Sequence, residues 1–279
     1  MPAYCCADMA QGAGPNVRFY GSDAQLCPDT ESLSAKVQPG DLVLGVNHFG
    51  RPAEALRRVA QSRPDVTWVE DCAQCVDTAA PAWAPLRIFS PRKVMCAADG
   101  GVLIDHDGRL PVPAQSPAAS ARLRHAGLLR SRDPLDQNNA LWYAAFQRAE
   151  AAMDVSNHEM SARSQRLLQA TPLSALSDAR RRNYSHLHQS LGAIALWSDP
   201  APDWTPLGFP IRVKDAAALG AALARHRIFA PRHWAKLATG TPPAIEAQLS
   251  RQLLTLSCDQ RYDLRDMDRL IAAVQDCAL

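Results

Sequence analysis

The spacing of apolar residues along the first third of the chain changes repeatedly between the period of a strand and that of a helix. Short apolar runs bounded by Gly, Pro and Asp predict strands at Val17–Tyr20, Leu42–Val46, Val66–Val69, Leu86–Phe89 and Val102–Ile104. Helical spacing lies between them, at Ser32–Val37 and Ala53–Gln61. Such alternation is typical of a parallel sheet with helices on both faces, and the unbroken apolar run at 42–46 suits a strand covered on both sides.

The rest of the chain predicts a different arrangement, with long helices and few strands. Helices are expected at Ala118–Leu129, Asn138–Met153, Ser161–Ala170, Leu173–Leu191, Asp215–Arg227 and Leu264–Val274. Strands are expected at Phe209–Val213, Ile228–Ala230 and Leu253–Leu256. We therefore predict an α/β fold with a mainly parallel sheet in a large domain, residues 1–155, and a smaller α+β C-terminal domain, residues 156–279.

Composition and charge narrow the classes of function. The 279 residues are 47% apolar and 21% charged, and the net charge of +2 gives no reason to expect nucleic acid or a membrane surface as a partner. No apolar run approaches the length of a transmembrane helix. The start, Met1 to Cys6, has neither the basic nor the apolar region of a signal peptide, so we expect a cytoplasmic protein. The run Arg180–Arg182 is expected on a solvated helix face.

Two ionisable residues stand at predicted strand ends. Asp71 follows the run 66–69 and Lys93 follows the run 86–89, and ligands bind outside the carboxyl ends of strands in open α/β sheets. Pyridoxal phosphate needs an amine that bonds to its aldehyde and a carboxylate that keeps its pyridine nitrogen protonated. Lys93 and Asp71 have this chemistry, although by residue type alone they also fit an ordinary aspartate and an exposed lysine in a weak ion pair.

Segments around these two residues, and others far from them, form a wider pattern. Those segments are Pro2-Ala3-Tyr4, Asn47-His48-Phe49-Gly50, Asp71-Cys72-Ala73-Gln74, Ile88-Phe89-Ser90-Pro91-Arg92-Lys93, Asp99-Gly100-Gly101 and Val155-Ser156-Asn157-His158-Glu159-Met160-Ser161. Together they resemble the DegT/DnrJ/EryC1/StrS family of sugar aminotransferases. The corresponding family segments read Pro-x-Tyr, His-x-x-Gly, Asp-x-Ala-Gln, Ser-Phe-x-Pro-Thr-Lys, acidic-Gly-Gly and Gly-x-Asn-x-Arg-Met-Ser, and the resemblance extends over almost the whole chain.

The resemblance implies a fold-type I aminotransferase-like large domain and pyridoxal phosphate as the cofactor. It implies Lys93 as the catalytic lysine, and Asp71, Gln74, Ser90 and Asn157 as cofactor-binding residues, with Asn157 reaching the cofactor of a neighbouring subunit. The implied substrate is a keto sugar nucleotide or another small ketone. The implied assembly is a homodimer, or a heterodimer with a complete family member. We expect Lys93 and Asp71 to lie in one cleft, with Gln74 beside them.

The chain also departs from the family pattern. Met1 directly precedes Pro2, so we expect the family's N-terminal phosphate-binding segment to be absent, unless a longer reading frame exists upstream. Ile88 replaces a phosphate-contacting serine and has no hydroxyl, and Glu159 reverses the charge of an arginine. Ser90 keeps the strand face of position 88. These departures leave two alternatives open: a non-catalytic relative that pairs with a complete partner subunit, and a lysine-dependent enzyme without pyridoxal phosphate.

Eight cysteines occur in a chain without a secretion signal, so reduced thiols are expected. Cys72 and Cys75 form a Cys-x-x-Cys spacing, which is compatible with redox activity or with half of a zinc site. No second pair with ligand spacing completes a zinc site, and we expect no metal.

Overall fold

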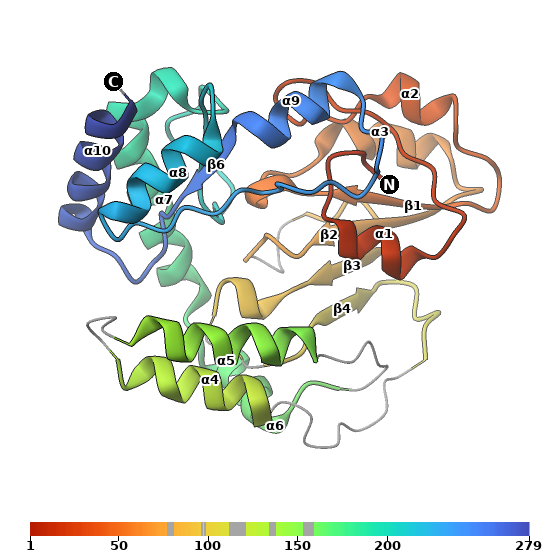
Figure 1. Cartoon of the computed structure of the whole chain (residues 1–279). Helices are drawn as coiled ribbons and strands as arrows, with labels where there is room; N and C mark the ends of the chain where they lie inside the picture. Colours follow the sequence, from red (N-terminus) through yellow and green to blue (C-terminus); the bar gives the residue numbers. More distant parts are fainter. Residues whose placement is uncertain are drawn as a thin grey trace.

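Figure 1 shows the computed structural model of the chain, which contains two separate β-sheets surrounded by helices. The structure describes residues 1–76, 81–95, 97, 99–111, 121–133, 138–152 and 159–278. The predicted domain boundary at 155/156 lies outside these residues and stays a prediction.

The N-terminal part is built on a four-stranded sheet. Its strands follow the order of the chain: β1 (Leu42–Val46), β2 (Thr67–Cys72), β3 (Leu86–Phe89) and β4 (Val102–Asp105). The first three strands are parallel, and β4 runs antiparallel to β3. The predicted mainly parallel sheet is therefore confirmed, including the strand that begins at Val102.

The second strand is longer than its apolar pattern predicted, because it continues through Glu70 and Asp71. These neighbouring carboxylates point to opposite faces of the sheet, as successive residues of a strand do. Glu70 Oε1 accepts a hydrogen bond from Asn47 Nδ2 at 2.7 Å, and Glu70 Oε2 lies 3.2 Å from Arg87 Nε. A buried carboxylate that is paired in this way is tolerated in the core, so β2 continues past Glu70.

Helices cover both faces of this sheet (Figure 1). On one face, α2 (Thr30–Ser34) and α3 (Glu54–Ser62) enclose a core of Tyr20, Leu33, Val43, Leu56, Trp68 and Trp83. On the other face, α1 (Ala7–Ala13) contributes Met9 to a smaller cluster that contains Cys5, Leu44, Val46 and Val69. Asp71 belongs to this second face, because it lies two residues after Val69.

The strand predicted at Val17–Tyr20 is wrong. Only Tyr20 pairs, in an isolated bridge with Pro2, and its hydroxyl donates a hydrogen bond to Leu44 O at 2.9 Å. An apolar run becomes a strand only where a neighbouring backbone offers a continuous edge, and the segment at Pro2 offers a single bridge.

The C-terminal part contains a two-stranded antiparallel sheet, β5 (Phe209–Arg212) and β6 (Leu253–Leu256). Its helices are α6 (Ala162–Ala170), α7 (Leu173–Leu191), α8 (Ala216–Arg225), α9 (Ala244–Gln252) and α10 (Leu264–Ala278). Residues of α7, α8 and α10 pack with the sheet in the largest core cluster of the described residues. The strand predicted at Ile228–Ala230 is wrong, since this segment is irregular, and α9 was not predicted.

The helices α4 (Ala121–Ser131) and α5 (Asn139–Ala151) pack against each other as a hairpin at one side of the molecule (Figure 1). Large apolar side chains of this hairpin are exposed: Leu128, Leu141, Tyr143 and Phe146. None of the helices that the structure describes is both long enough and apolar enough to span a membrane.

The charged run on α7 is not uniformly solvated, which corrects the expectation for Arg180. This side chain is only 1% exposed, whereas Arg181 is half-buried and pairs with Asp178, and Arg182 is exposed. Helical spacing explains the difference, because position 180 falls on the buried stripe that contains Leu176 and Leu187.

Arg180 fastens the C-terminal loops to α7. Its Nη1 donates to Pro206 O at 3.1 Å and to Leu207 O at 2.7 Å. Its Nε donates to Gln260 Oε1 at 2.7 Å, and its Nη2 lies 3.2 Å from Asp259 Oδ2. These hydrogen bonds and the ion pair offset the cost of removing the Arg180 guanidinium from water.

We predict that Arg180→Ala lowers the free energy of unfolding by about 3 kcal/mol, because buried acceptors and the Asp259 carboxylate lose their donor. Arg181→Ala, one residue away with an exposed i,i+3 pair, is the matched control and should cost less than about 0.5 kcal/mol. Urea denaturation followed by circular dichroism measures both. Equal losses for the two variants would contradict the structural role of Arg180.

Candidate active site

Asp71 lies near the end of β2, next to Val46 on β1 and Ile88 on β3. Its side chain is buried, and Oδ1 accepts a hydrogen bond from the Ala73 amide at 2.8 Å. Burial raises the pKa of this carboxyl, while the Ala73 amide and the charge of Lys93 oppose the rise. The apolar side chain at Ile88, which takes the place of a hydroxyl in the family pattern, contributes to the cluster on this face.

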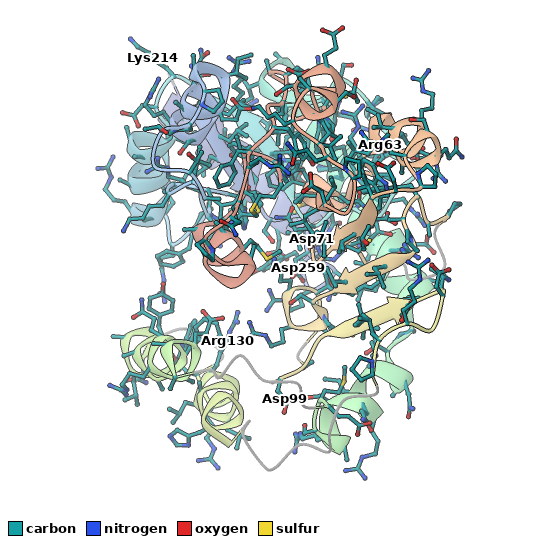
Figure 2. The ribbon with its side chains drawn as sticks, turned by 90° about the vertical axis from the view of Figure 1, so that its right-hand side faces the viewer. Arg63, Asp71, Asp99, Arg130, Lys214 and Asp259 are labelled. Atoms are coloured by element: carbon teal, nitrogen blue, oxygen red, sulfur yellow. The ribbon has the colours of Figure 1, made fainter. Side chains whose placement is uncertain are left out.

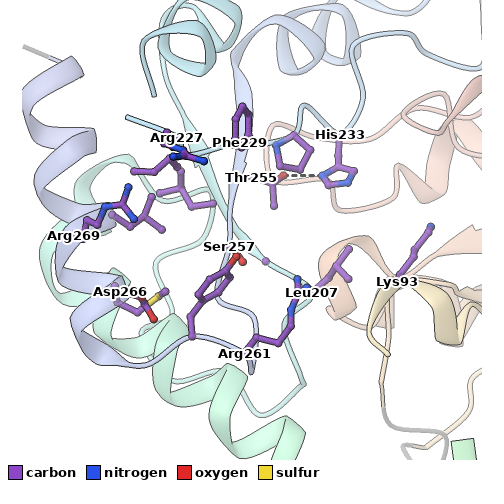
Figure 3. A pocket seen from close by; sticks show the side chains of 18 of the residues that line it. Lys93, Leu207, Arg227, Phe229, His233, Thr255, Ser257, Arg261, Asp266 and Arg269 are labelled. Atoms are coloured by element: carbon purple, nitrogen blue, oxygen red, sulfur yellow. Dashed lines mark hydrogen bonds between the residues drawn. The ribbon is translucent and has the colours of Figure 1, made fainter. Parts of the chain in front are cut away.

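Lys93 ends η2 (Pro91–Lys93), a short 3₁₀ turn that follows β3. Its backbone amide donates to Ser90 O at 3.1 Å, and the next amide, Val94 N, donates to Pro91 O at 3.1 Å. Gln260 Nε2 donates to Val94 O at 2.9 Å, so the turn is tied to the same residue that Arg180 holds. The backbone is thus fixed while the Lys93 side chain is exposed and extends toward a cavity (Figure 3).

The positive charge of Lys93 acts on two buried groups. It opposes the rise of the Asp71 pKa, and together with burial, the larger cause, it lowers the pKa of His233 to about 4. Lys93 and Asp71 are both described in the structure and form no direct ion pair, so their interaction acts over a longer distance. His233 is therefore neutral near pH 7.

Gln74 and Ser90 make contacts that sequence reasoning did not anticipate. Gln74 is buried in the turn after β2, and its Oε1 accepts a hydrogen bond from the Phe49 amide. It thereby holds η1 (His48–Gly50), the segment after β1. Ser90 uses its carbonyl to cap the turn of Lys93, and its hydroxyl makes no capping hydrogen bond. Asn157 lies outside the described residues.

His233 is the residue of this region that the sequence did not reveal. Its Nδ1 lies 2.9 Å from Thr255 Oγ1 (Figure 3). The Tyr4 hydroxyl donates a hydrogen bond to its carbonyl. Tyr4 and His233 are separated by 229 positions in the chain. The sequence contains eight scattered histidines, and no motif spacing distinguishes His233 from the others. Only the fold brings it to face Lys93.

A cavity of about 760 Å³ lies between the turn of Lys93 and the C-terminal sheet (Figure 3). Among the described residues that line it, the cationic side chains are Lys93, Arg130, Arg227, Arg261 and Arg269, and the one carboxylate is Asp266. Aromatic side chains also line it: Trp142, Tyr143, Phe229 and Tyr262. Asp71 is not a lining residue.

The lining arginines are positioned by contacts of their own. Arg130 stacks over the Trp142 ring at 4.9 Å, Arg269 donates to His226 O at 2.8 Å, and Arg261 pairs with Asp259 at 2.9 Å. An excess of cations beside aromatic rings suits an anionic ligand that also carries a flat ring. Within the described part of the chain, no three His, Cys, Asp or Glu side chains form a group that could hold a metal ion.

No model of a known protein family matches the sequence, and no curated protein matches it either. Solved structures match the fold over almost the whole chain. A DegT DnrJ EryC1 StrS aminotransferase from Brucella abortus is 16% identical with a TM-score of 0.68, covering 99% of this chain and 78% of its own.

Two further structures are similar. DesI, solved in the presence of its TDP-sugar product, is 18% identical with a TM-score of 0.67, covering 100% of this chain and 74% of its own. The ntda protein of Bacillus subtilis with bound cofactor PMP is 14% identical with a TM-score of 0.67, covering 100% of this chain and 67% of its own. The chain therefore has the fold of these aminotransferases, which confirms at the level of fold the resemblance found in the motifs.

Asp71→Asn should stabilise the protein near neutral pH, because the folded state raises the pKa of Asp71 and thus holds its charged form at a cost. The gain should vanish in acid, where Asp71 is protonated in both states. It should grow as pH rises above the ordinary carboxyl pKa of about 4 and level off once folded Asp71 ionises. Thermal melts across pH measure this change.

Asp65→Asn is the control of opposite sign. The exposed Asp65 carboxyl has a pKa lowered by Arg63, at the outer surface (Figure 2), so its replacement should destabilise the protein near neutral pH. A Asp71→Asn variant that loses stability at neutral pH would contradict the electrostatic description of Asp71.

Proposed function

We propose that this chain is a pyridoxal-phosphate-dependent aminotransferase-like protein that acts on a keto sugar nucleotide. The observation that carries the proposal is that Lys93, exposed at the cavity after β3, and the buried carboxylate Asp71, at the end of β2, lie at the same edge of two neighbouring parallel strands. The fold shared with sugar aminotransferases supports the same reaction class.

The donor set fits the cofactor's chemistry. Asp71 is a buried carboxylate whose raised pKa would fall beside a protonated pyridine nitrogen, and Lys93 supplies the amine. Pyridoxal phosphate, when bound, supplies an electron sink for the substrate's amine carbon.

The chain's own residues would divide the remaining work. Lys93, exposed at the end of a fixed turn, is able to reach a substrate carbon and carry a proton to or from it. His233 is neutral and bonded to Thr255, so it can accept or donate a hydrogen bond without adding charge. Gln74 would act indirectly, by holding the turn next to Asp71.

The substrate side of the proposal is supported by the charge of the cavity. Its arginines suit a diphosphate and its aromatic rings suit a nucleobase, and its volume of about 760 Å³ is within the usual range for small-molecule sites. The solved DesI structure, determined with a TDP-sugar product, gives a related fold with such a ligand.

The apolar Ile88 beside Asp71 favours the alternatives left open by the sequence, because it offers no hydroxyl to a phosphate. These are a non-catalytic relative that pairs with a complete partner subunit, and an enzyme that uses Lys93 without pyridoxal phosphate. The cofactor experiment below separates them from the main proposal.

We further propose that the α4–α5 hairpin mediates association with a second copy of this chain or with a complete relative. Leu141 is 59% exposed, and Leu128 and Phe146 of the same hairpin are exposed as well. Exposed apolar side chains that gather on one element are typical of interaction sites. Arg92, next to Lys93, pairs with Glu150 of α5 at 3.3 Å, so the hairpin is linked to the site.

In the cofactor experiment, the protein incubated with pyridoxal phosphate should develop the visible absorption band of lysine-bound cofactor, and borohydride should fix the cofactor on Lys93. Lys93→Ala should abolish the band, while Lys214→Ala, at the outer surface (Figure 2), should retain it. The phosphate contact that Ile88 does not offer weakens binding by about 1.5–3 kcal/mol, or roughly tenfold or more, so the cofactor series extends to millimolar concentration.

An unmodified Lys93 at millimolar cofactor would rule out the pyridoxal-phosphate reading. Lys93→Ala then distinguishes the two alternatives, because only a lysine-dependent enzyme loses activity with this change.

For association, Leu141→Glu should weaken self-association by roughly tenfold or more, since a buried leucine contributes about 1.5–3 kcal/mol. Gln147→Glu, an exposed polar position on the same helix, is the control and should leave association unchanged. Size-exclusion chromatography with light scattering over a dilution series measures the equilibrium. A wild-type monomer at micromolar concentration would contradict the homodimer.

A further inference from the structure

Cys72 and Cys75 occupy the two ends of a tight turn. Cys72 is the last residue of β2, Ala73 and Gln74 form the turn, and the Cys75 amide donates to Cys72 O at 2.8 Å. The first and fourth residues of such a turn have Cα atoms less than about 7 Å apart. Disulfides span about 4.4–6.8 Å between Cα atoms, so this backbone already has the separation that a disulfide requires.

The side chains at the two ends of this turn also influence each other. The Cys75 thiol is the largest cause of the raised pKa of Cys72, followed by burial. The two differ in exposure, since Cys72 is fully buried while Cys75 is half-buried. A thiol in solution would therefore meet Cys75 first.

The buried thiol is part of a polar network and does not merely fill the core. Cys72 Sγ accepts from Asn47 Nδ2 at 3.4 Å and lies 3.9 Å from Arg87 Nη2. Cys75 Sγ contacts Gly50 O at 3.9 Å. Two thiols at the ends of one tight turn, with one reachable from solvent, form the arrangement of an attacking and a resolving cysteine.

We propose that Cys72 and Cys75 form a redox-active dithiol, which a small-molecule disulfide oxidises reversibly to an intramolecular disulfide. The Cys75 thiol loses its proton to solvent, its thiolate attacks one sulfur of the oxidant, a mixed disulfide forms, and one thiolate of the oxidant leaves. Cys72 then gives its proton to that thiolate and attacks the Cys75 sulfur. The second thiolate of the oxidant leaves and takes up a proton from solvent. Two electrons pass from the protein to the oxidant, which becomes two thiols.

This dithiol does not depend on the proposed aminotransferase activity. It does border the candidate site, because Gln74 lies between the two cysteines and Asp71 directly precedes them. Closing the disulfide would fix the turn that holds the Phe49 amide.

The experiment treats the full-length protein with oxidised glutathione, blocks remaining thiols with iodoacetamide and maps tryptic peptides by mass spectrometry. Trypsin does not cut before Pro64, so residues 59–87 form one peptide whose only cysteines are Cys72 and Cys75. This peptide should lose two hydrogens, escape alkylation, and recover both thiols after dithiothreitol. The peptide of residues 19–36 contains only Cys27, which is exposed and should gain a single glutathione.

Two variants test the order of attack. Cys72→Ala should trap glutathione on Cys75, and Cys75→Ala should leave Cys72 unmodified. If Cys72→Ala fails to fold, the order of attack is still tested by the wild-type protein and by Cys75→Ala, which replaces a half-buried side chain. Glutathione that stays on wild-type Cys75 without ring closure, or modification of Cys27 alone, would overturn the proposal, as would glutathione on Cys72 in Cys75→Ala.

Discussion

The buried pairing of Glu70 with Arg87 and Asn47 is the interaction on which the rest of this site depends. It allows β2 to carry two successive carboxylates through the core, one on each face of the sheet. Glu70 has a cation and an amide in direct contact, whereas Asp71 has only a backbone amide and the more distant charge of Lys93. Glu70 is thus a structural carboxylate, whereas the charge of Asp71 is only partly compensated. A partly compensated buried carboxylate favours a positively charged group beside it.

The second support of the site comes from the other end of the chain. Arg180 holds Gln260, and Gln260 holds the carbonyl of Val94, so the position of Lys93 depends on a helix almost a hundred residues away. The Tyr4 hydroxyl fixes the carbonyl of His233 in the same manner. Lys93 and His233 face each other because two polar chains join the N-terminal and C-terminal sheets, and neither chain is visible as a sequence motif.

The sequence predicted elements well where a single rule decides them. The ranges expected for β1, β6 and α7 agree with the structure, because continuous apolar runs and helical periodicity leave no competing interpretation. Prediction failed where contacts with distant parts of the chain decide the structure. Residues 17–20 and 228–230 are apolar, but no neighbouring strand offers them a continuous edge to pair with. Arg180 is buried because protein groups from distant loops accept its hydrogen bonds. Of the candidate site, the positions of Asp71 and Lys93 at strand ends could be predicted, while the role of His233 could not, because nothing local marks it.

The electrostatics of the site define what can occupy it. Arg227, Arg261 and Arg269 line the cavity and give it an excess of positive charge, which attracts an anionic group. Asp71 does not line the cavity, and its buried carboxylate is stabilised by positive charge. Lys93 does line the cavity, and its charge disfavours protonation of His233 while it stabilises the ionised form of Asp71. A simple anion beside the arginines would leave Asp71 at its raised pKa. A molecule that carried an anionic group beside the arginines and a protonated nitrogen beside Asp71 would be stabilised by both, so the electrostatics of the site favour a dipolar ligand.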